Sequence, residues 1–204
     1  MLKLVHAILV AAAFVATAPA VTAAPSTGKD VAVRVQKDGA TFTVHAEFTV
    51  PASVDECWEV LTDYDKMSQI VTAVDSSRIV KRDGNRLEVE QKSHAVAGPL
   101  KFSTSSLREV ELIPNKEIRS KLLKGDLKSQ EFTTRVVDEG AMMRVVVSGK
   151  FVVGGLTGSA IGVDSVEAGT RRQYLELRDE ILRRKAKQPP PACLLAKTCE
   201  DPST

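Results

Sequence analysis

The sequence predicts an α+β fold in which a curved antiparallel sheet wraps around a long C-terminal helix, with two short helices near the N-terminus. Three observations predict this fold. Short alternating segments recur between residues 30 and 153 with turn residues between them, as in an antiparallel meander. A short helical pattern interrupts them at residues 53–71. A longer amphipathic pattern follows them at residues 161–185.

The first two strands are predicted to form a hairpin. Asp38-Gly39 lies between two alternating runs in residues 31–50, and this dipeptide favours a tight turn. Alternation places His45 on the solvent side of the second strand. The opposite face of that strand carries the apolar side chains Phe42, Val44, Ala46 and Phe48.

Residues 50–71, VPASVDECWEVLTDYDKMSQIV, predict the two short helices. Ser53 and Glu56 have the spacing of a capping box, and Asp65 is expected to cap the second helix. The apolar stripe of the first helix is Val54, Cys57, Trp58 and Leu61. The inward residues of the second are Met67, Ile70 and Val71. Two such helices must close over something, so Trp58 either fills a core or forms a wall of a cavity.

The later segments predict about six strands and one long helix. The strand segments are 76–81, 86–94, 100–112, 117–123, 128–137 and 142–153. A Gly-rich hinge or helix entry, GGLTGSAIG, then precedes the helix. Its apolar positions recur at spacings of three and four: Val163, Val166, Thr170, Tyr174, Leu177 and Ile181.

The two ends of the chain read as segments outside the domain at residues 30–185. Residues 1–23 have the pattern of a cleaved secretory signal peptide, which predicts export to a periplasm. Residues 186–204 read as a flexible Pro-rich tail. Cys193 and Cys199 lie close together in this tail and are predicted to form a local disulfide. Cys57 is expected to be a buried small hydrophobe instead.

Composition and motifs narrow the function classes. A formal net charge of +2 gives no electrostatic footprint for nucleic acid. No nucleophile motif, metal-ligand spacing or phosphate loop is present, so we expect no cofactor and no metal. Asp63 and Asp65 are interpreted as helix caps, and His94 as a solvent-side strand residue. An enzyme is therefore less favoured than a binding protein.

The element order and the segment at residues 50–71 resemble the START-like, polyketide cyclase/dehydrase (SRPBCC) superfamily, whose fold is the helix-grip. The resemblance covers about residues 30–185. It rests on Val50-Pro51-Ala52, on Trp58, on Val60–Tyr64 and on the later VDSSRIVKRDGNRLEVEQ. It is greatest for the branch that includes coenzyme Q-binding proteins. This resemblance implies a cavity between the long helix and the sheet, suited to a hydrophobic or amphipathic small molecule.

Alternation also places polar residues on faces that should point inward, either as cavity lining or at a solvent rim. The three groups are Leu87, Val89, Gln91 and Ser93; Phe102, Thr104 and Ser106; and Ile118, Ser120 and Leu122. For the ligand-binding residues we predict the set Trp58, Phe102, Phe132, Met143, Tyr174 and Leu177.

Three functions remain in view. We favour periplasmic binding or transfer of a lipid, quinone or isoprenoid type of molecule. The alternatives are a cyclase or dehydratase acting in the same cavity and an envelope protein-interaction module that uses the tail at 186–204. A transient membrane contact stays open, as does the oligomeric state.

Overall fold

A computed structural model of the chain describes residues 31–97, 100–154 and 161–187. The predicted signal peptide, the tail beyond residue 187, the predicted Cys193–Cys199 disulfide and most of the Gly-rich segment lie outside the described residues. The elements, in chain order, are β1 (Ala32–Asp38), β2 (Thr41–Val50), α1 (Val54–Thr62), the 3-10 helix η1 (Tyr64–Lys66), α2 (Met67–Ile70), β3 (Val74–Asp83), β4 (Arg86–Ala97), β5 (Leu100–Ile113), β6 (Glu117–Gly125), β7 (Leu127–Asp138), β8 (Met143–Val153) and α4 (Val163–Lys187).

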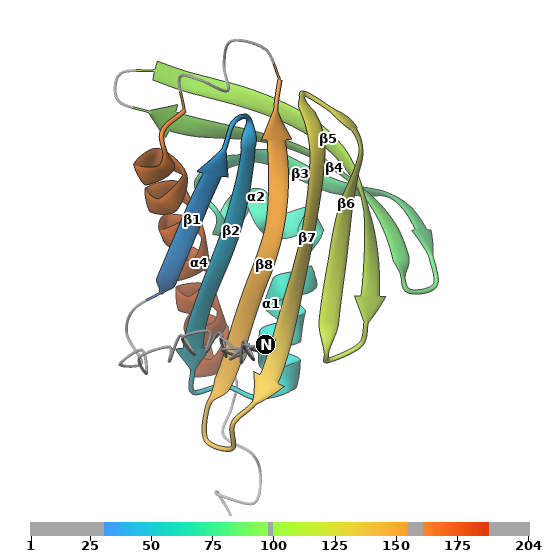
Figure 1. The fold of residues 1–204 in the computed structure, drawn as a ribbon. Helices are drawn as coiled ribbons and strands as arrows, with labels where there is room; N and C mark the ends of the chain where they lie inside the picture. The colour runs from blue at the N-terminus through green and yellow to red at the C-terminus, as the bar shows by residue number, and fades with distance from the viewer. Residues whose placement is uncertain (1–30, 98–99, 155–160, 188–204) are drawn as a thin grey trace, which may run out of the picture.

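The strands form one eight-stranded sheet in the order β1-β2-β8-β7-β6-β5-β4-β3, and every neighbouring pair is antiparallel (Figure 1). The N-terminal hairpin joins the last strand, so β2 lies beside β8. The remaining strands follow one another as a meander. The predicted antiparallel sheet is thus confirmed.

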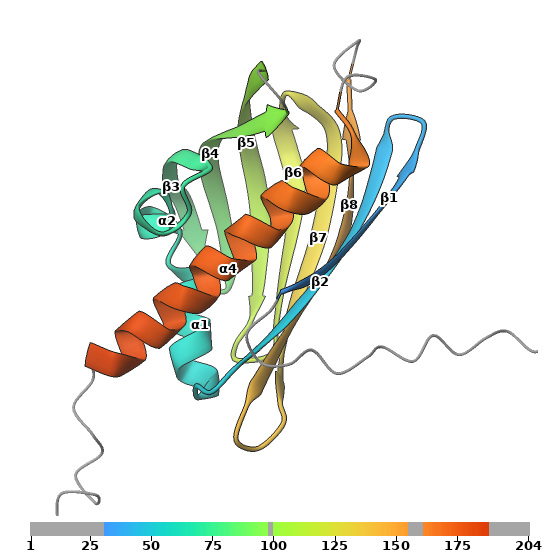
Figure 2. The same ribbon diagram turned by 90° about the vertical axis from the view of Figure 1, so that its left-hand side faces the viewer.

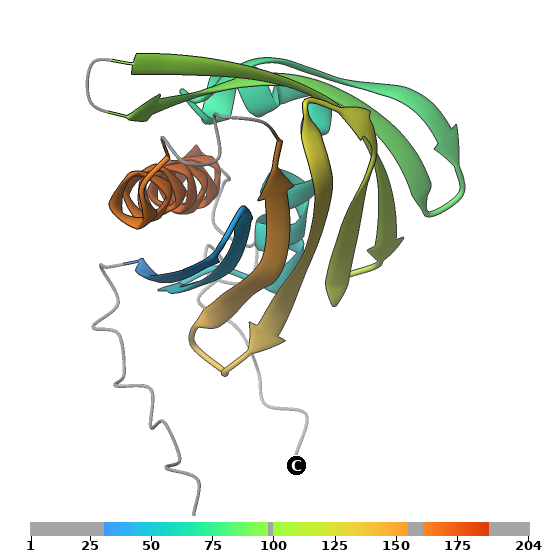
Figure 3. The ribbon, with the colours of Figure 1, turned by 45° about the horizontal axis from the view of Figure 1, so that its top comes forward.

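The sheet is strongly curled, and α4 lies across its concave side (Figures 2 and 3). Seen from the top, α4 lies between β1 and the β4–β5 end of the sheet. Its contacts include β1, β2, β4, α1 and α2. This arrangement is the helix-grip that the sequence predicts. We call the side of the sheet that looks toward α1, η1 and α4, together with the space it encloses, the interior.

Turn residues set the hairpins where the sequence places them. Gly39 and Gly84 have positive φ angles of 55° and 54°, which glycine adopts without steric cost. Asp38 pairs with Thr41, and Asp83 pairs with Arg86, so each turn has two central residues. These tight turns fix the register and thus which face of each strand points inward.

The core consists mainly of small and branched apolar side chains on the inner face of the sheet. Phe42, Val44, Ala46 and Phe48 are all buried, and His45 is exposed, as alternation predicts. One register row crosses six strands through Leu87, Val110, Ser120, Phe132, Gly149 and Val44. Packing of the inner face against α1 and α4 forms the hydrophobic core.

The first short helix begins as predicted. Ser53 Oγ accepts a hydrogen bond from the Glu56 backbone N–H at 3.2 Å, and Glu56 Oε2 accepts one from Ser53 N–H at 2.6 Å. Cys57 is fully buried, and burial raises the pKa of its thiol to about 12. Met67 and Val71 are buried under the second helix, which confirms their inward placement.

The two aspartates differ from the prediction, because neither carboxylate caps a helix. Asp65 lies inside η1, and its Oδ1 accepts from the backbone N–H of Ile79 on β3 at 2.8 Å. Asp63 makes no side-chain capping bond and instead pairs with Arg184 of α4. Both aspartates therefore connect the short helices to distant elements, which local spacing cannot reveal.

Within the described ranges, no helix combines the length and apolar character that crossing a membrane requires.

Candidate functional site

Most of the predicted ligand-binding residues meet in the interior. Met143 and Leu177 are buried in the main core cluster, and Trp58, Phe132 and Tyr174 are partly buried against it. Phe102 is half-buried on β5 and lies outside that cluster as the described residues define it. The structure thus brings five of the six together, while their contact with a ligand stays a prediction.

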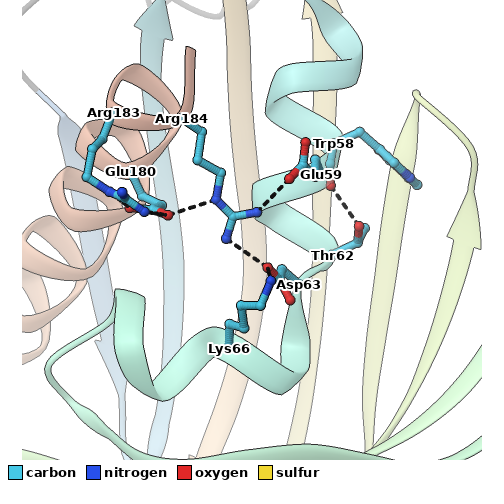
Figure 4. A network of polar contacts seen from close by, with 8 residues as sticks. All are labelled: Trp58, Glu59, Thr62, Asp63, Lys66, Glu180, Arg183 and Arg184. Atoms are coloured by element: carbon cyan, nitrogen blue, oxygen red, sulfur yellow. Dashed lines mark hydrogen bonds and ion pairs between the residues drawn. The ribbon is translucent and has the colours of Figure 1, made fainter. Parts of the chain in front are cut away.

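The aromatic residues of this set pack against different partners. The rings of Tyr174 and Phe48 lie 6.3 Å apart between centroids, which joins α4 to β2. Phe132 pairs with Gly149 and covers the place where a side chain on that residue would lie. Trp58 extends from α1 on the side away from the polar network at the end of α4 (Figure 4). Its half-buried ring packs on the core and keeps both alternatives open, core filling and cavity wall.

The feature that sequence reasoning missed is Arg108 on β5. Its strand neighbours alternate, and the inward series Phe102, Thr104, Ser106 continues through Arg108 to the fully buried Val110. Arg108 Nη2 donates a hydrogen bond to Gln91 Oε1 on β4. Its Nε–H is buried and has no partner among the described residues. Continuing the alternation by one more residue would have found it.

Two tyrosines face Arg108 from the helical side of the interior. Tyr64 belongs to η1 and Tyr174 to α4, and both interact electrostatically with the guanidinium. Burial raises the pKa of Tyr64 to about 12 and also raises that of Tyr174, although Arg108 opposes both shifts. Burial likewise lowers the pKa of Arg108. Both phenols are therefore neutral hydrogen-bond donors at neutral pH.

Arg108 stands at one end of a polar band on the inner face, which consists of Arg108, Ser77, Gln91, Ser93, Thr104 and Ser106. Gln91 Nε2 donates to Ser93 Oγ at 2.9 Å, and Ser77 pairs in register with Gln91. The hydroxyl oxygens of Ser77 and Ser120 are buried without a partner among the described residues. At these two positions the inward polar groups are enclosed, not placed at a solvent rim. Unpartnered buried polar groups of this kind are unusual in a native core, where such groups normally bind another protein group or ordered water.

A second polar cluster joins the C-terminal end of α4 to α1 (Figure 4). Arg184 donates to Glu180 at 2.7 Å, to Glu59 at 2.9 Å and to Asp63 at 2.7 Å. Glu180 also receives two bonds from Arg183. A hollow of about 350 Å³ adjoins these side chains. We call this cluster the Arg184 network, and it ties the long helix to the short ones.

The Arg184 network predicts an acid-sensitive contribution to stability. Hydrogen bonds from Arg183 and Arg184 lower the pKa of Glu180 to about 2, from an ordinary value of 4.5. Because the folded-state pKa is depressed, the contribution, which is at most about 3 kcal/mol, is complete above pH 4.5 and disappears as the pH falls toward 2. Glu180→Gln should lower the melting temperature at pH 7 and flatten its decline between pH 4.5 and 2, measured by circular dichroism.

The control for this experiment is Glu90→Gln, which removes an exposed partner of Arg78. Such surface pairs contribute little to stability. A Glu90→Gln profile that matches that of Glu180→Gln would show that the Arg184 network has no special role.

The His94–Asp75 pair lies outside the polar band. His94 Nδ1 contacts Asp75 Oδ1 at 2.8 Å, with Asp75 exposed. The described residues contain no group of three or more His, Cys, Asp or Glu that is arranged to hold a metal. A larger hollow of about 520 Å³ is lined mostly by outward side chains of β2 and β5–β8, with mixed charges that include Glu109, Arg119 and Lys150.

Comparison with known proteins agrees with this architecture. A family model described as polyketide cyclase/dehydrase and lipid transport matches residues 50–162, which is more than half of the chain. The chain belongs to this family. Its description joins activities on hydrophobic molecules, so membership implies that the chain binds a hydrophobic small molecule. No curated protein matches the sequence of this family member.

Solved structures resemble this family member in fold. A protein from Thermus thermophilus is 21% identical with a TM-score of 0.61, and the match covers 72% of this chain and 99% of that one. A Zhui aromatase/cyclase from Streptomyces sp. R1128 is 19% identical, with a TM-score of 0.57 and coverage of 72% and 94%. A STAR-related lipid transfer protein from Xanthomonas axonopodis is 14% identical, with a TM-score of 0.63 and coverage of 78% and 97%.

Proposed function

We propose that the mature protein works in the periplasm, where it binds or transfers a hydrophobic or amphipathic small molecule of lipid, quinone or isoprenoid type. The ligand lies in the interior, between α4 and the inner face of the sheet. Family membership supports the hydrophobic ligand, and the N-terminal sequence supports export.

The single observation that carries this proposal is the amphipathic character of the interior. Apolar side chains such as Val89 and Val110 adjoin the polar band on the same face of the sheet. A hydrocarbon part gains free energy by burial at about 25 cal/mol per Å², and a few polar groups then orient the ligand. The unpartnered Ser77 and Ser120 hydroxyls are suited to this second role.

The decisive experiment is to purify the mature protein from a periplasmic extract without detergent, denature it and identify the released small molecules by mass spectrometry. We expect a hydrophobic compound in a stoichiometric ratio to protein. Protein that is empty and also fails to take up lipid from a total lipid extract would overturn the binding function. Mass determination of the same sample tests cleavage after residue 23.

Trp58 provides a direct optical test of where the ligand lies. It is the single tryptophan of the chain and it packs half-buried against the core. Binding should shift its emission to shorter wavelength and reduce quenching by acrylamide, because the ligand excludes water from the ring. Trp58→Phe should retain binding measured by another probe, with an affinity reduced several-fold. Tight binding with unchanged Trp58 emission would contradict the placement of Trp58 at the site.

A cyclase type of reaction in the same interior is the second candidate function. The neutral phenols of Tyr64 and Tyr174 beside Arg108 favour it, because such groups donate protons or hydrogen bonds to a developing oxyanion. A proton-abstracting base is the weaker part of this candidate. No described His, Asp or Glu residue is buried, and His45 and Asp75 are exposed. Binding therefore remains the better supported function.

A further inference from the structure

We propose that the ligand is an anionic amphiphile with a carboxylate head group, and that Arg108 binds this carboxylate inside the grip. This inference rests on the proposed binding function and adds the charge and the orientation of the ligand. It is drawn from the surroundings of the Arg108 guanidinium, which hold neutral hydrogen-bond donors and no anionic side chain among the described residues.

The charge balance around Arg108 favours a bound anion. The polar side chains that face it are Gln91 from β4, Tyr64 from η1 and Tyr174 from α4. All three are uncharged at neutral pH, and no ion pair links Arg108 to a carboxylate within the described ranges. By contrast, Arg184 and Arg119 do have carboxylate partners. A half-buried cation with an enclosed Nε–H and no counter-charge is costly, and a bound anion would remove that cost.

Arg108 also has an unused hydrogen-bond donor that an anion can accept from. Arg108 uses one Nη2 donor on Gln91, while its Nε–H is buried and has no partner among the described residues. The guanidinium is planar and matches the two oxygens of a carboxylate. Tyr64 and Tyr174 interact electrostatically with Arg108, and their neutral hydroxyls add further donors on the helical side. Together these groups form a site for an oxygen anion, with Gln91 fixing the plane of the guanidinium.

A carboxylate fits this site better than a phosphate monoester does. A phosphate monoester carries nearly two negative charges at neutral pH and needs more than one cation for compensation. The inner faces of β4, β5 and β6 near Arg108 carry no second Lys or Arg between residues 86–94 and 102–122. One guanidinium with neutral donors therefore matches a group of single charge.

The hydrocarbon part of the ligand meets apolar side chains directly beside Arg108. The cross-strand partners of Arg108 are Val89 and Leu122, and the next inward residue along β5 is Val110. Val89 and Val110 are fully buried, so the apolar surface begins directly beside the cation. A molecule bound by its carboxylate at Arg108 thus meets apolar side chains within one residue pair. This combination fits a fatty-acid type of ligand better than a neutral quinone or isoprenoid alcohol.

The test compares matched ligands on the mature, delipidated protein. A long-chain fluorescent polyene fatty acid and its methyl ester have the same hydrocarbon chain and differ in head-group charge. Titration should give a dissociation constant about tenfold lower for the acid than for the ester, as expected for one charge-assisted contact. Arg108→Met should abolish this preference by weakening acid binding and leaving ester binding nearly unchanged. Arg119→Met, which removes an exposed outer-face arginine, should retain the full preference.

Thermal unfolding is the readout that controls for folding. Without ligand, Arg108→Met should melt at or above the wild-type temperature, because the substitution removes a half-buried charge that has no carboxylate partner among the described residues. The acid should raise the wild-type melting temperature more than the ester, and it should lose this advantage in the variant. Arg108→Gln, which keeps hydrogen-bonding capacity, serves as a second uncharged variant.

The outcomes separate the inference from the function on which it rests. Equal binding of acid and ester by the wild type would overturn the carboxylate site and leave the proposed binding function intact. An acid preference that persists in both uncharged variants would show that a group other than Arg108 binds the carboxylate. That result would also overturn the proposed role of Arg108. Failure of both ligands to bind, with an empty protein from the periplasm, would overturn the binding function as well.

Discussion

Gly149→Val should prevent stable folding, and Gly149→Ala should cost about 3 kcal/mol of the free energy of unfolding, at the upper end of the usual range for overpacked cores. A Cβ atom at Gly149 would lie 2.3 Å from the backbone oxygen of Glu131 and 2.5 Å from Phe132 Cδ1. The first of these contacts is with backbone of the neighbouring strand, so a side-chain rotation cannot relieve it. Chemical denaturation of the alanine variant measures the loss.

The position of Gly149 explains why the effect is so large. It lies on β8 between Val44 of β2 and Phe132 of β7, in the row that crosses the centre of the sheet. Phe132 covers the glycine with its ring. The matched control is Gly169→Ala in α4, where a Cβ atom meets nothing within 4 Å. This control should stabilise the protein by about 1 kcal/mol, because alanine favours a helix over glycine. Equal effects at the two sites would refute the packing argument.

The fold could be predicted from the sequence because its signals are local. Asp38-Gly39 and Asp83-Gly84 mark hairpins, Ser53 and Glu56 mark a helix start, and each of these features spans only a few residues of chain. Alternation then gives the inner face of each strand once the turns fix the register. The curl of the sheet around α4 followed from the order of the elements and from the resemblance to a known family.

The polar contacts between distant elements could not be predicted in the same way. Asp63 and Asp65 have the spacing of caps, yet their carboxylates bind Arg184 and the backbone of Ile79. Both partners come from other elements, and the bond between Asp63 and Arg184 spans 121 residues of sequence. Local spacing identifies a residue that is able to cap a helix. It does not reveal a stronger partner that the fold brings alongside.

Arg108 shows a different reason for a missed site. The alternation that places Thr104 and Ser106 inward also places Arg108 inward, so the pattern contained the information. A charged residue is usually assigned to the solvent side, because burial of an unpaired charge is costly. Because of that general expectation, the inward position of Arg108 on β5 was not predicted. A break in the usual rule of burial is often where a protein holds its ligand.

The attachment of α4 combines few apolar anchors with many polar ones. Arg171, Arg178 and Lys185 donate to the backbone oxygens of Val31, Thr49 and Pro51, respectively. The buried apolar anchors of α4 are Leu177 and Ile181. Each hydrogen bond replaces one that the unfolded chain makes with water, so its net contribution to stability is modest. The two apolar anchors should therefore carry most of the energy that holds α4 over the interior.

Ile181→Ala should accordingly lower the free energy of unfolding by about 3 kcal/mol, near the middle of the range for truncating a buried isoleucine to alanine. Ile181 has no exposed surface, and α4 contacts α1 and α2 as well as the sheet. Ile181→Val, which removes one methylene, should cost about 1 kcal/mol. Val80→Ala, at an exposed position of β3, should change stability by less than about 0.5 kcal/mol. Chemical denaturation of the three variants gives these values.

The same substitution should also release α4 locally, because a helix held by few apolar contacts opens before the sheet does. In Ile181→Ala, the free energy of opening that hydrogen exchange reports for the α4 amides should fall by about 3 kcal/mol. Exchange in β7 and β8 should occur only through global unfolding. Since α4 covers the interior (Figure 2), faster opening should raise the dissociation rate of a bound ligand. If α4 exchange and ligand release stay at wild-type rates while stability falls, the remaining contacts of α4, which include Leu177 and the Arg184 network, are sufficient to hold the helix in place.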